Sequence, residues 1–386
     1  MRRFLGWTAT VVAVLVLVGL FAGGWYYSDQ LLPAPAPDAA VYDVEVVATD
    51  ADAGTLDLAV DDGDLVRLAT LGFETESSLV LLDDATPAAV DGTVRRSGLL
   101  LDGDWPTVGA LGRAVVAAFP GAPANGLTHD EVVVPGPLGD LPAWRVAGRP
   151  DGDLADDGTW AVLVHGRGAS RDEVNRSLPI LHDLGLPSLV VTVRNDPEAP
   201  ADPDGWGRFG DTEWEDLHAA TSWLAEQAGA TRFVLVGYSQ GGGIVLSHLR
   251  RAPDADAVVA VVGVSPLVSL HDTLVLQAQG RGIPDPVIPP LLLVTKAITD
   301  VRSGLDFSRV EHAAAADEFD TPMLLFHGTD DVTVPVGPTR ELAERRPDLV
   351  TYEEFGDTDH VREWNADRDR FETALRDFLL EHVPAG

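Results

Sequence analysis

Residues 233–243 read Phe-Val-Leu-Val-Gly-Tyr-Ser-Gln-Gly-Gly-Gly. The first four residues are apolar, as in a short buried strand, and a helical pattern begins directly after them. Between the two lies Gly237-x-Ser239-x-Gly241, the spacing of a sharp strand-to-helix turn that lifts a serine hydroxyl above the edge of a sheet. The same string arises by chance in glycine-rich sequences, so the assignment of Ser239 as a nucleophile depends on partner residues elsewhere in the chain.

From Glu131 onward, apolar strands alternate with helical patterns. A leading antiparallel pair is expected at 131–134 and 143–147, and continuous apolar runs follow at 160–164, 188–193, 232–236, 257–262 and 322–326. Helical patterns occur at 174–184, 212–227, 242–251, 339–346 and 367–381. This alternation predicts the α/β class, with a mostly parallel sheet covered by helices on both faces. Ligands of such sheets bind at the carboxyl ends of the strands.

A nucleophilic serine needs a base and a carboxylate that orients the base. The strand Met323–Phe326 leads into a loop that holds Asp330 and Asp331, and either carboxylate could serve. We predict Asp331, because the Asp-x-x-Val-Pro spacing lets the chain turn while this carboxylate points back. His360 is the only histidine between this acid and the last helix, so we predict it as the base rather than a surface or capping residue.

The loop His165-Gly-Arg-Gly168 directly follows the strand at 160–164. Such loops offer backbone N–H groups to a developing negative charge. We predict the backbone N–H groups of Arg167 and Gln240 as the oxyanion hole, and a structural role for His165. Arg194–Asp196 ends another strand at the same edge, either lining the pocket or forming a hydrogen-bonded turn. These His and Asp residues lack the tight spacing of metal ligands, so we expect no metal and no cofactor.

Residues 131–383 resemble the α/β-hydrolase superfamily in His165-Gly-Arg-Gly168, Gly237-Tyr-Ser-Gln-Gly241, His327-Gly-x-x-Asp331 and His360. Within it they are similar to bacterial serine-aminopeptidase-like and acylaminoacyl-peptidase-like hydrolases, including membrane-anchored ones. The resemblance implies a catalytic triad of Ser239, Asp331 and His360 acting through an acyl-enzyme. It does not identify the substrate, because this superfamily hosts esterases, lipases, peptidases, thioesterases and acyltransferases.

An uncharged apolar stretch, residues 4–27, follows Arg2 and Arg3. Its length is near the ~20 residues that cross a bilayer as a helix. Trp7 at one end and Trp25-Tyr26-Tyr27 at the other fit interfacial aromatic belts. The flanking arginines predict a cytoplasmic N-terminus and an extracytoplasmic remainder, anchored in the cell membrane by a single pass. The alternative is a signal peptide cleaved near residues 22–24.

The sequence divides into an N-terminus and anchor at 1–28, a Pro-rich linker at 29–40, a β-rich region at 41–128 and a catalytic domain at 129–386. In the β-rich region, strands are expected at 44–47, 55–60 and 65–69, and the first helical candidate is 107–116. Residues 266–319 form an insertion with helical candidates at 270–279 and 289–301. We expect it to be a small lid above Ser239, and its apolar run 288–294 favours an apolar pocket beneath it.

The net charge of −34 argues against nucleic-acid binding, which needs clustered Lys and Arg. The chain has no cysteine, which excludes disulfides, thiolate metal sites and cysteine nucleophiles. The leading hypothesis is a membrane-anchored serine hydrolase that cleaves a carboxylic ester, or a related acyl bond, of a small molecule. The alternatives are an acylaminoacyl- or aminopeptidase-like enzyme acting on a peptide, and a non-catalytic scaffold that keeps the fold. The sequence does not indicate the oligomeric state.

Overall fold

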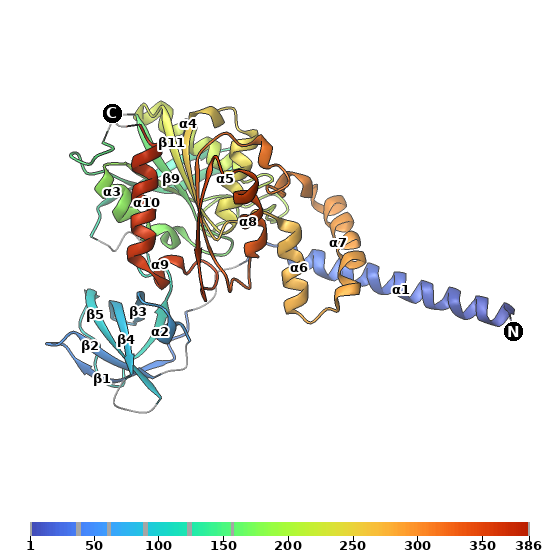
Figure 1. The fold of residues 1–386 in the computed structure, drawn as a ribbon, viewed down its shortest axis with the longest axis horizontal. Helices are drawn as coiled ribbons and strands as arrows, with labels where there is room; N and C mark the ends of the chain where they lie inside the picture. Colours follow the sequence, from blue (N-terminus) through green and yellow to red (C-terminus); the bar gives the residue numbers. More distant parts are fainter. Residues whose placement is uncertain are drawn as a thin grey trace.

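The computed structural model describes residues 2–35, 40–59, 63–87, 92–121, 126–155 and 158–384. Figure 1 shows a long N-terminal helix, a small β-barrel and a larger sheet covered by helices. The predicted Pro-rich linker is therefore described only in part, because residues 36–39 lie outside these ranges.

The N-terminal helix α1 spans Arg2–Leu31. Its 30 residues correspond to a length of about 45 Å at ~1.5 Å per residue. Within it, Thr10–Leu31 is long and apolar enough to cross a membrane, and almost none of this segment is buried in the protein. A signal sequence has the same properties, so the retained anchor stays a prediction.

The β-rich region is a closed barrel with the strand order β1-β2-β5-β4-β3-β6. Its strands are β1 (Val44–Asp50), β2 (Thr55–Ala59), β3 (Leu71–Thr75), β4 (Ser78–Pro87), β5 (Thr93–Gly103) and β6 (Leu111–Val115), and a short helix, α2 (Asp64–Arg67), precedes β3. All of the paired strands run antiparallel, and β6 closes the barrel by pairing with β1 and β3. Alternate inward residues such as Val46, Leu58, Phe73 and Val80 fill its interior.

Two sequence expectations for this region are wrong. Residues 65–69 are not a strand, because the backbone turns into α2 and the buried Arg96 guanidinium donates to the carbonyls of Leu65, Leu68 and Ala69 at its end. Residues 107–116 are not helical, because the barrel needs a strand here between β1 and β3. The local sequence favoured a helix, and the pairing partners of β6 overrode that preference.

The larger sheet has eight strands in the order β14-β13-β12-β11-β9-β10-β8-β7. The strands are β7 (His129–Gly136), β8 (Gly139–Val146), β9 (Thr159–Val164), β10 (Ser188–Val191), β11 (Arg232–Tyr238), β12 (Val258–Val264), β13 (Met323–Gly328) and β14 (Val350–Phe355). Neighbours from β14 to β10 pair in parallel, whereas β8 pairs antiparallel with β10 and β7. The central strands β10, β11 and β13 are buried at every residue except Arg232, as expected when helices cover both faces.

Helices cover this sheet on two sides, as Figure 1 shows. Helices α3 (Leu178–Leu184) and α10 (Arg368–His382) pack on one face, and α4 (Trp214–Ala228), α5 (Gln240–Arg251) and α8 (Val336–Arg345) pack on the other. Shorter helices are α9 (Glu363–Ala366), η1 (Arg171–Arg176), η2 (Ala255–Ala257), η4 (Phe307–Val310) and η5 (Ala316–Glu318). Each core is built from alternate residues of the same strands, for example Leu163 on the first face and Val162 on the second.

The insertion between β12 and β13 carries α6 (Leu270–Gly280), η3 (Asp285–Val287) and α7 (Ile288–Ser303). The C-terminal part of α1 packs against α7, and the rest of α1 projects away from the body (Figure 1). A Cβ added at Gly24 would lie 2.7 Å from Val294, so glycine permits this close approach. Farther along, Arg302 donates to the buried Ser28 hydroxyl at 2.9 Å and pairs with Asp29 at 2.6 Å.

The barrel is fastened to the larger domain close to α9. Arg362 forms a salt bridge with Asp64 of α2 at 2.7 Å. The buried Asn365 side chain donates to the carbonyls of Thr70 and Val116, both at 2.9 Å. The barrel thus contacts the segment that directly follows His360.

Candidate active site

Ser239 occupies the turn between β11 and α5. Its backbone has φ 50° and ψ −117°, a region that residues with side chains rarely adopt. The flanking glycines make the turn feasible, since a Cβ on Gly237 would lie 2.5 Å from the carbonyl oxygen of Gly241. The strained turn presents the Ser239 hydroxyl at the start of α5.

Three side chains from distant parts of the chain form one hydrogen-bonded line. The Ser239 hydroxyl lies 2.9 Å from Nε2 of His360, in the loop after β14. Nδ1 of His360 lies 2.6 Å from Oδ2 of Asp331, in the loop after β13. Because a carboxylate only accepts, Nδ1–H donates to Asp331 and leaves Nε2 free to accept from Ser239.

The buried Asp331 carboxylate is fully occupied by donors. Its Oδ1 accepts from the backbone N–H groups of Thr333 at 2.8 Å and Val334 at 2.7 Å, and Nε2 of His327 lies 3.3 Å from its Oδ2. Burial alone would raise the pKa of Asp331, but hydrogen bonds from His327, His360 and the backbone hold this pKa well below its usual range. Burial opposes protonation of His360, yet the facing Asp331 carboxylate raises the pKa of His360 above its ordinary value. The structure brings Asp331, not Asp330, to His360.

The loop after β9 lies beside the serine. A Cβ added at Gly166 would stand 2.9 Å from the Cβ of Ser239. The N–H of Gly166 donates to a carboxylate oxygen of Glu173 at 2.6 Å, so it is already engaged. In the part of the chain that the structure describes, the backbone N–H groups of Arg167 and Gln240 have no hydrogen-bond acceptor. Both predicted donors are therefore available to a bound oxyanion.

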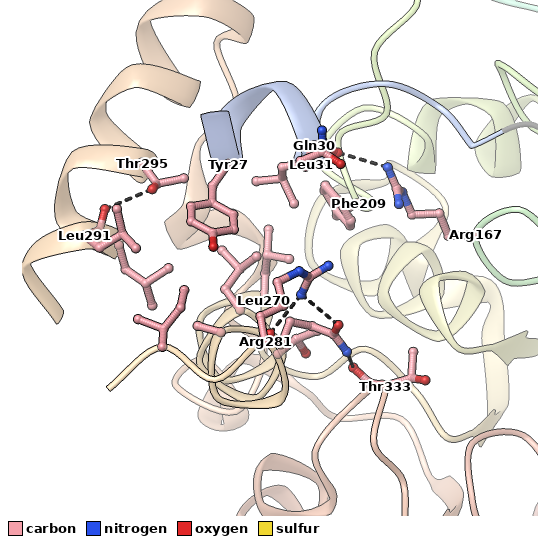
Figure 2. A pocket seen from close by; sticks show the side chains of 16 residues that line it. Tyr27, Gln30, Leu31, Arg167, Phe209, Leu270, Arg281, Leu291, Thr295 and Thr333 are labelled. Atoms are coloured by element: carbon pink, nitrogen blue, oxygen red, sulfur yellow. Dashed lines mark hydrogen bonds between the residues drawn. The ribbon is translucent and has the colours of Figure 1, made fainter. Parts of the chain in front are cut away.

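The Arg167 side chain reaches in the opposite direction, to the end of α1. Its guanidinium donates to the carbonyls of Leu31 at 2.9 Å and Pro33 at 2.6 Å, and lies 5.1 Å from the centre of the Phe209 ring. Figure 2 shows Arg167 beside Leu31 and Phe209. Burial lowers the pKa of Arg167. The candidate oxyanion loop is thus tied directly to the N-terminal helix.

His165 and Asp196 form a second His–Asp pair, with Nε2 and Oδ2 2.9 Å apart. Burial opposes protonation of His165, but Asp196 raises the pKa of His165 to about 9. Asp196 also accepts from the N–H of Val193. Arg194 turns away into a buried salt bridge with Asp216 at 2.8 Å. This segment is thus a hydrogen-bonded turn that holds the loop after β9.

Sequence reasoning missed a buried pair beneath His360. The Ser265 hydroxyl donates to Glu363 at 2.6 Å and accepts from the N–H of Val361 at 3.2 Å. Glu363 is fully buried, and its charge contributes to the raised pKa of His360. Both residues belong to no motif, and only their burial in the fold reveals them.

Among the described residues, no cluster of three or more His, Asp or Glu side chains could hold a metal ion. The arrangement offers a hydroxyl nucleophile, a base that is held in one tautomer by a carboxylate, and available N–H donors beside them. These are the groups needed for acyl transfer.

The eight-stranded sheet with a serine at its strand-to-helix turn has the α/β-hydrolase fold, which a solved esterase structure shares. Residues 202–384 match the prolyl oligopeptidase family. A search of curated proteins found no significant match.

Among solved structures, the chain is similar in fold to the esterase Pf2001 of Pyrococcus furiosus. One crystal form gives a TM-score of 0.53 at 19% identity, over 68% of this chain and 95% of the esterase. A second crystal form gives a TM-score of 0.52 at 20% identity, over 68% of this chain and 96% of the esterase. A serine hydrolase without a lid, XC6422 of Xanthomonas campestris, gives a TM-score of 0.47 at 18% identity, over 67% of this chain and 96% of that protein.

Proposed function

We propose that this chain is a serine hydrolase that cleaves a carboxylic ester, with Ser239 as nucleophile, His360 as general base and Asp331 as the residue that orients His360. The observation that carries the proposal is the continuous hydrogen-bonded line of 2.9 Å and 2.6 Å through these three side chains. A serine hydroxyl is a weak nucleophile until a positioned base removes its proton.

In the first half-reaction, Ser239 Oγ bonds to the ester carbonyl carbon while His360 Nε2 takes the hydroxyl proton. The Asp331 carboxylate stabilises the imidazolium that forms. His360 then passes the proton to the oxygen of the leaving alcohol, and the acyl–oxygen bond breaks. In the second half, water attacks the acyl carbon with His360 as base, and the acid is released as Ser239 regains its proton.

Negative charge develops on the carbonyl oxygen in both halves. We assign the backbone N–H groups of Arg167 and Gln240 as its donors. Gln240 N–H lies at the N-terminus of α5, where the helix dipole adds favourable potential. Loss of one such donor typically costs about 10²–10³ in kcat.

A peptide substrate is the second candidate, and one observation favours it. Glu173 places a carboxylate beside Gly166, next to Ser239, where it could pair with the ammonium group of an unblocked N-terminus. That carboxylate is already engaged by the Gly166 N–H, so we place the ester first. Hydrolysis of aminoacyl p-nitroanilides, compared with simple p-nitrophenyl esters, distinguishes the two.

We further propose that α1 is a retained membrane anchor and that the catalytic domain lies outside the cytoplasm. Support comes from the uncharged exposed length of α1 and from the arginines that precede it. In this reading, α6 and α7 form the predicted lid. Protease digestion of the catalytic domain in intact spheroplasts tests the orientation, and complete protection would contradict it.

The catalytic assignment is tested by Ser239→Ala in the full chain. We expect turnover of p-nitrophenyl acetate to be lost and labelling by a fluorophosphonate probe to disappear, with the circular dichroism spectrum unchanged. Ser247→Ala, at a buried serine of the helix that follows Ser239, is the matched control and should keep both turnover and labelling. Full activity of Ser239→Ala would overturn the assignment.

A further inference from the structure

A partly apolar cavity lies between α1, α6 and α7 near the candidate site, and its volume is about 320 Å³. Figure 2 shows the side chains that line it. Half of the sixteen are apolar, among them Leu270, Leu274, Ala278 and Leu291, and the polar half includes Arg281, which donates to Gln277. The volume falls at the small end of the ~300–1,000 Å³ typical of small-molecule sites.

The N-terminal helix supplies part of the cavity wall. Tyr27, Gln30 and Leu31 come from its last two turns, and α7 faces them with Leu291 and Thr295. The contacts of Arg302 with Ser28 and Asp29 hold the two helices together just beyond the cavity. These contacts therefore hold the α1 side of the cavity wall in place.

The inner end of the cavity adjoins both loops of the candidate site. Arg167 comes from the loop that carries the predicted oxyanion donors, and Thr333 lies two residues after Asp331 and donates to it. Leu31 and Phe209 pack in one cluster with Leu267, whose N–H donates to the carbonyl of Ser239. The cavity thus adjoins the loops that flank Ser239, although Ser239 itself does not line it.

The outer end faces the free length of α1. Val287, directly before α7, and Leu293 and Val301 of α7 expose 41%, 71% and 88% of their surface. Figure 1 shows α7 as the part of the body nearest the projecting α1. Because α1 begins to pack on α7 near Gly24, the preceding stretch is what remains to cross a bilayer, which places α7 at the bilayer surface.

We infer that this cavity binds the hydrocarbon chain of an acyl ester that partitions into the membrane, and that the chain enters from the bilayer side between α1 and α7. The inference rests on the proposed ester hydrolysis and names its substrate class. Over most of the cavity surface, a polar acyl group would find no hydrogen-bond partner. Each methylene buried there instead gains free energy by leaving water.

The experiment uses the full chain solubilised in detergent. The substrates are p-nitrophenyl esters with two, four, six and eight acyl carbons, each kept below the concentration at which it forms micelles. For the wild type we expect kcat/KM to rise by about fourfold per added methylene until the cavity is filled. Ala278→Phe fills the cavity and should lower the ratio of kcat/KM for the eight-carbon to the two-carbon ester at least tenfold. Ala297→Phe, on the exposed side of α7, is the matched control and should keep the wild-type ratio.

Fluorophosphonate labelling of each variant reports whether its site is assembled. If Ala278→Phe does not fold, Leu274→Ala enlarges the same cavity and should move the preferred chain to a longer one. A wild-type ratio in Ala278→Phe, or an unchanged preference in Leu274→Ala, overturns the inference. Ser239-dependent hydrolysis of the two-carbon ester without any chain-length preference rejects only the cavity, whereas no hydrolysis of any ester rejects the proposed function itself.

Discussion

Asp331 provides a sharp test of the site, because its two carboxylate oxygens are held by different partners. Oδ1 accepts two backbone N–H groups, from Thr333 and Val334, whereas Oδ2 faces Nδ1 of His360 at 2.6 Å. In Asp331→Asn, the amide oxygen must take the Oδ1 position, since the amide nitrogen there would face two donors. The NH₂ group is then directed at His360.

The imidazole can meet this NH₂ group only by accepting at Nδ1, which moves its proton to Nε2. In that tautomer Nε2 cannot take a proton from Ser239, although every heavy atom keeps its place. The wrong tautomer costs about 10⁴-fold in kcat in enzymes of this mechanism. At ~1.4 kcal/mol per factor of ten, this loss corresponds to about 5 kcal/mol of transition-state stabilisation.

The assay is initial-rate hydrolysis of p-nitrophenyl acetate between pH 5 and pH 10, with thermal melting as the check on folding. The control is Asp330→Asn, one residue away in the same loop but exposed, which should retain activity within about twofold. The reasoning is refuted if Asp331→Asn stays within tenfold of the wild type, or if Asp330→Asn loses as much activity.

Two further predictions concern the groups around the triad. Because Asp331 raises the pKa of His360 and the reaction needs neutral His360, kcat/KM should fall as the pH drops through a value above the ordinary ~6.5. Glu363→Gln keeps an acceptor for Ser265 but removes a charge that favours the imidazolium, so it should move this acidic limb to lower pH; an unmoved limb would contradict the assignment. In Gly166→Ala the new Cβ would lie 2.9 Å from the Cβ of Ser239. If Ser239 is displaced by nearly ~1 Å to relieve this contact, turnover should fall about 10²-fold. Gly337→Ala, whose Cβ meets nothing within 4 Å, should leave turnover unchanged, and equal rates for both variants would contradict the steric argument.

The sequence allowed much of the site to be anticipated because of how a parallel sheet is built. Ser239, Asp331 and His360 each follow a strand, and the carboxyl ends of such strands meet at one edge, so their proximity follows from strand order. Their catalytic roles stay predictions. The α/β class follows from the same alternation of strands and helices.

Long-range contacts could not be anticipated in this way. α1 is apolar around its whole circumference, so no stripe marks the side that packs on α7, and the pairing of Ser28 with Arg302 joins residues far apart in the chain. The residues of β6 favour a helix by their own sequence, but their partners in the barrel, β1 and β3, decide that they form a strand. Glu363 lies in no motif, and its contact with Ser265 is visible only once the chain is folded.

Helix α1 contacts both α7 and the loop after β9, so it is joined directly to the larger domain. Arg302 contacts Ser28 and Asp29, and Arg167 donates to the carbonyls of Leu31 and Pro33. The end of α1 is therefore bonded directly to the candidate oxyanion loop. Under the proposed membrane anchoring, α1 itself rather than a flexible tether sets the height and tilt of the candidate site above the bilayer. A shortened protein that starts after α1 would keep Ser239, Asp331 and His360 but lose one wall of its apolar cavity and one of the two acceptors of Arg167, the carbonyl of Leu31. Its substrate preference would therefore misrepresent that of the full-length enzyme.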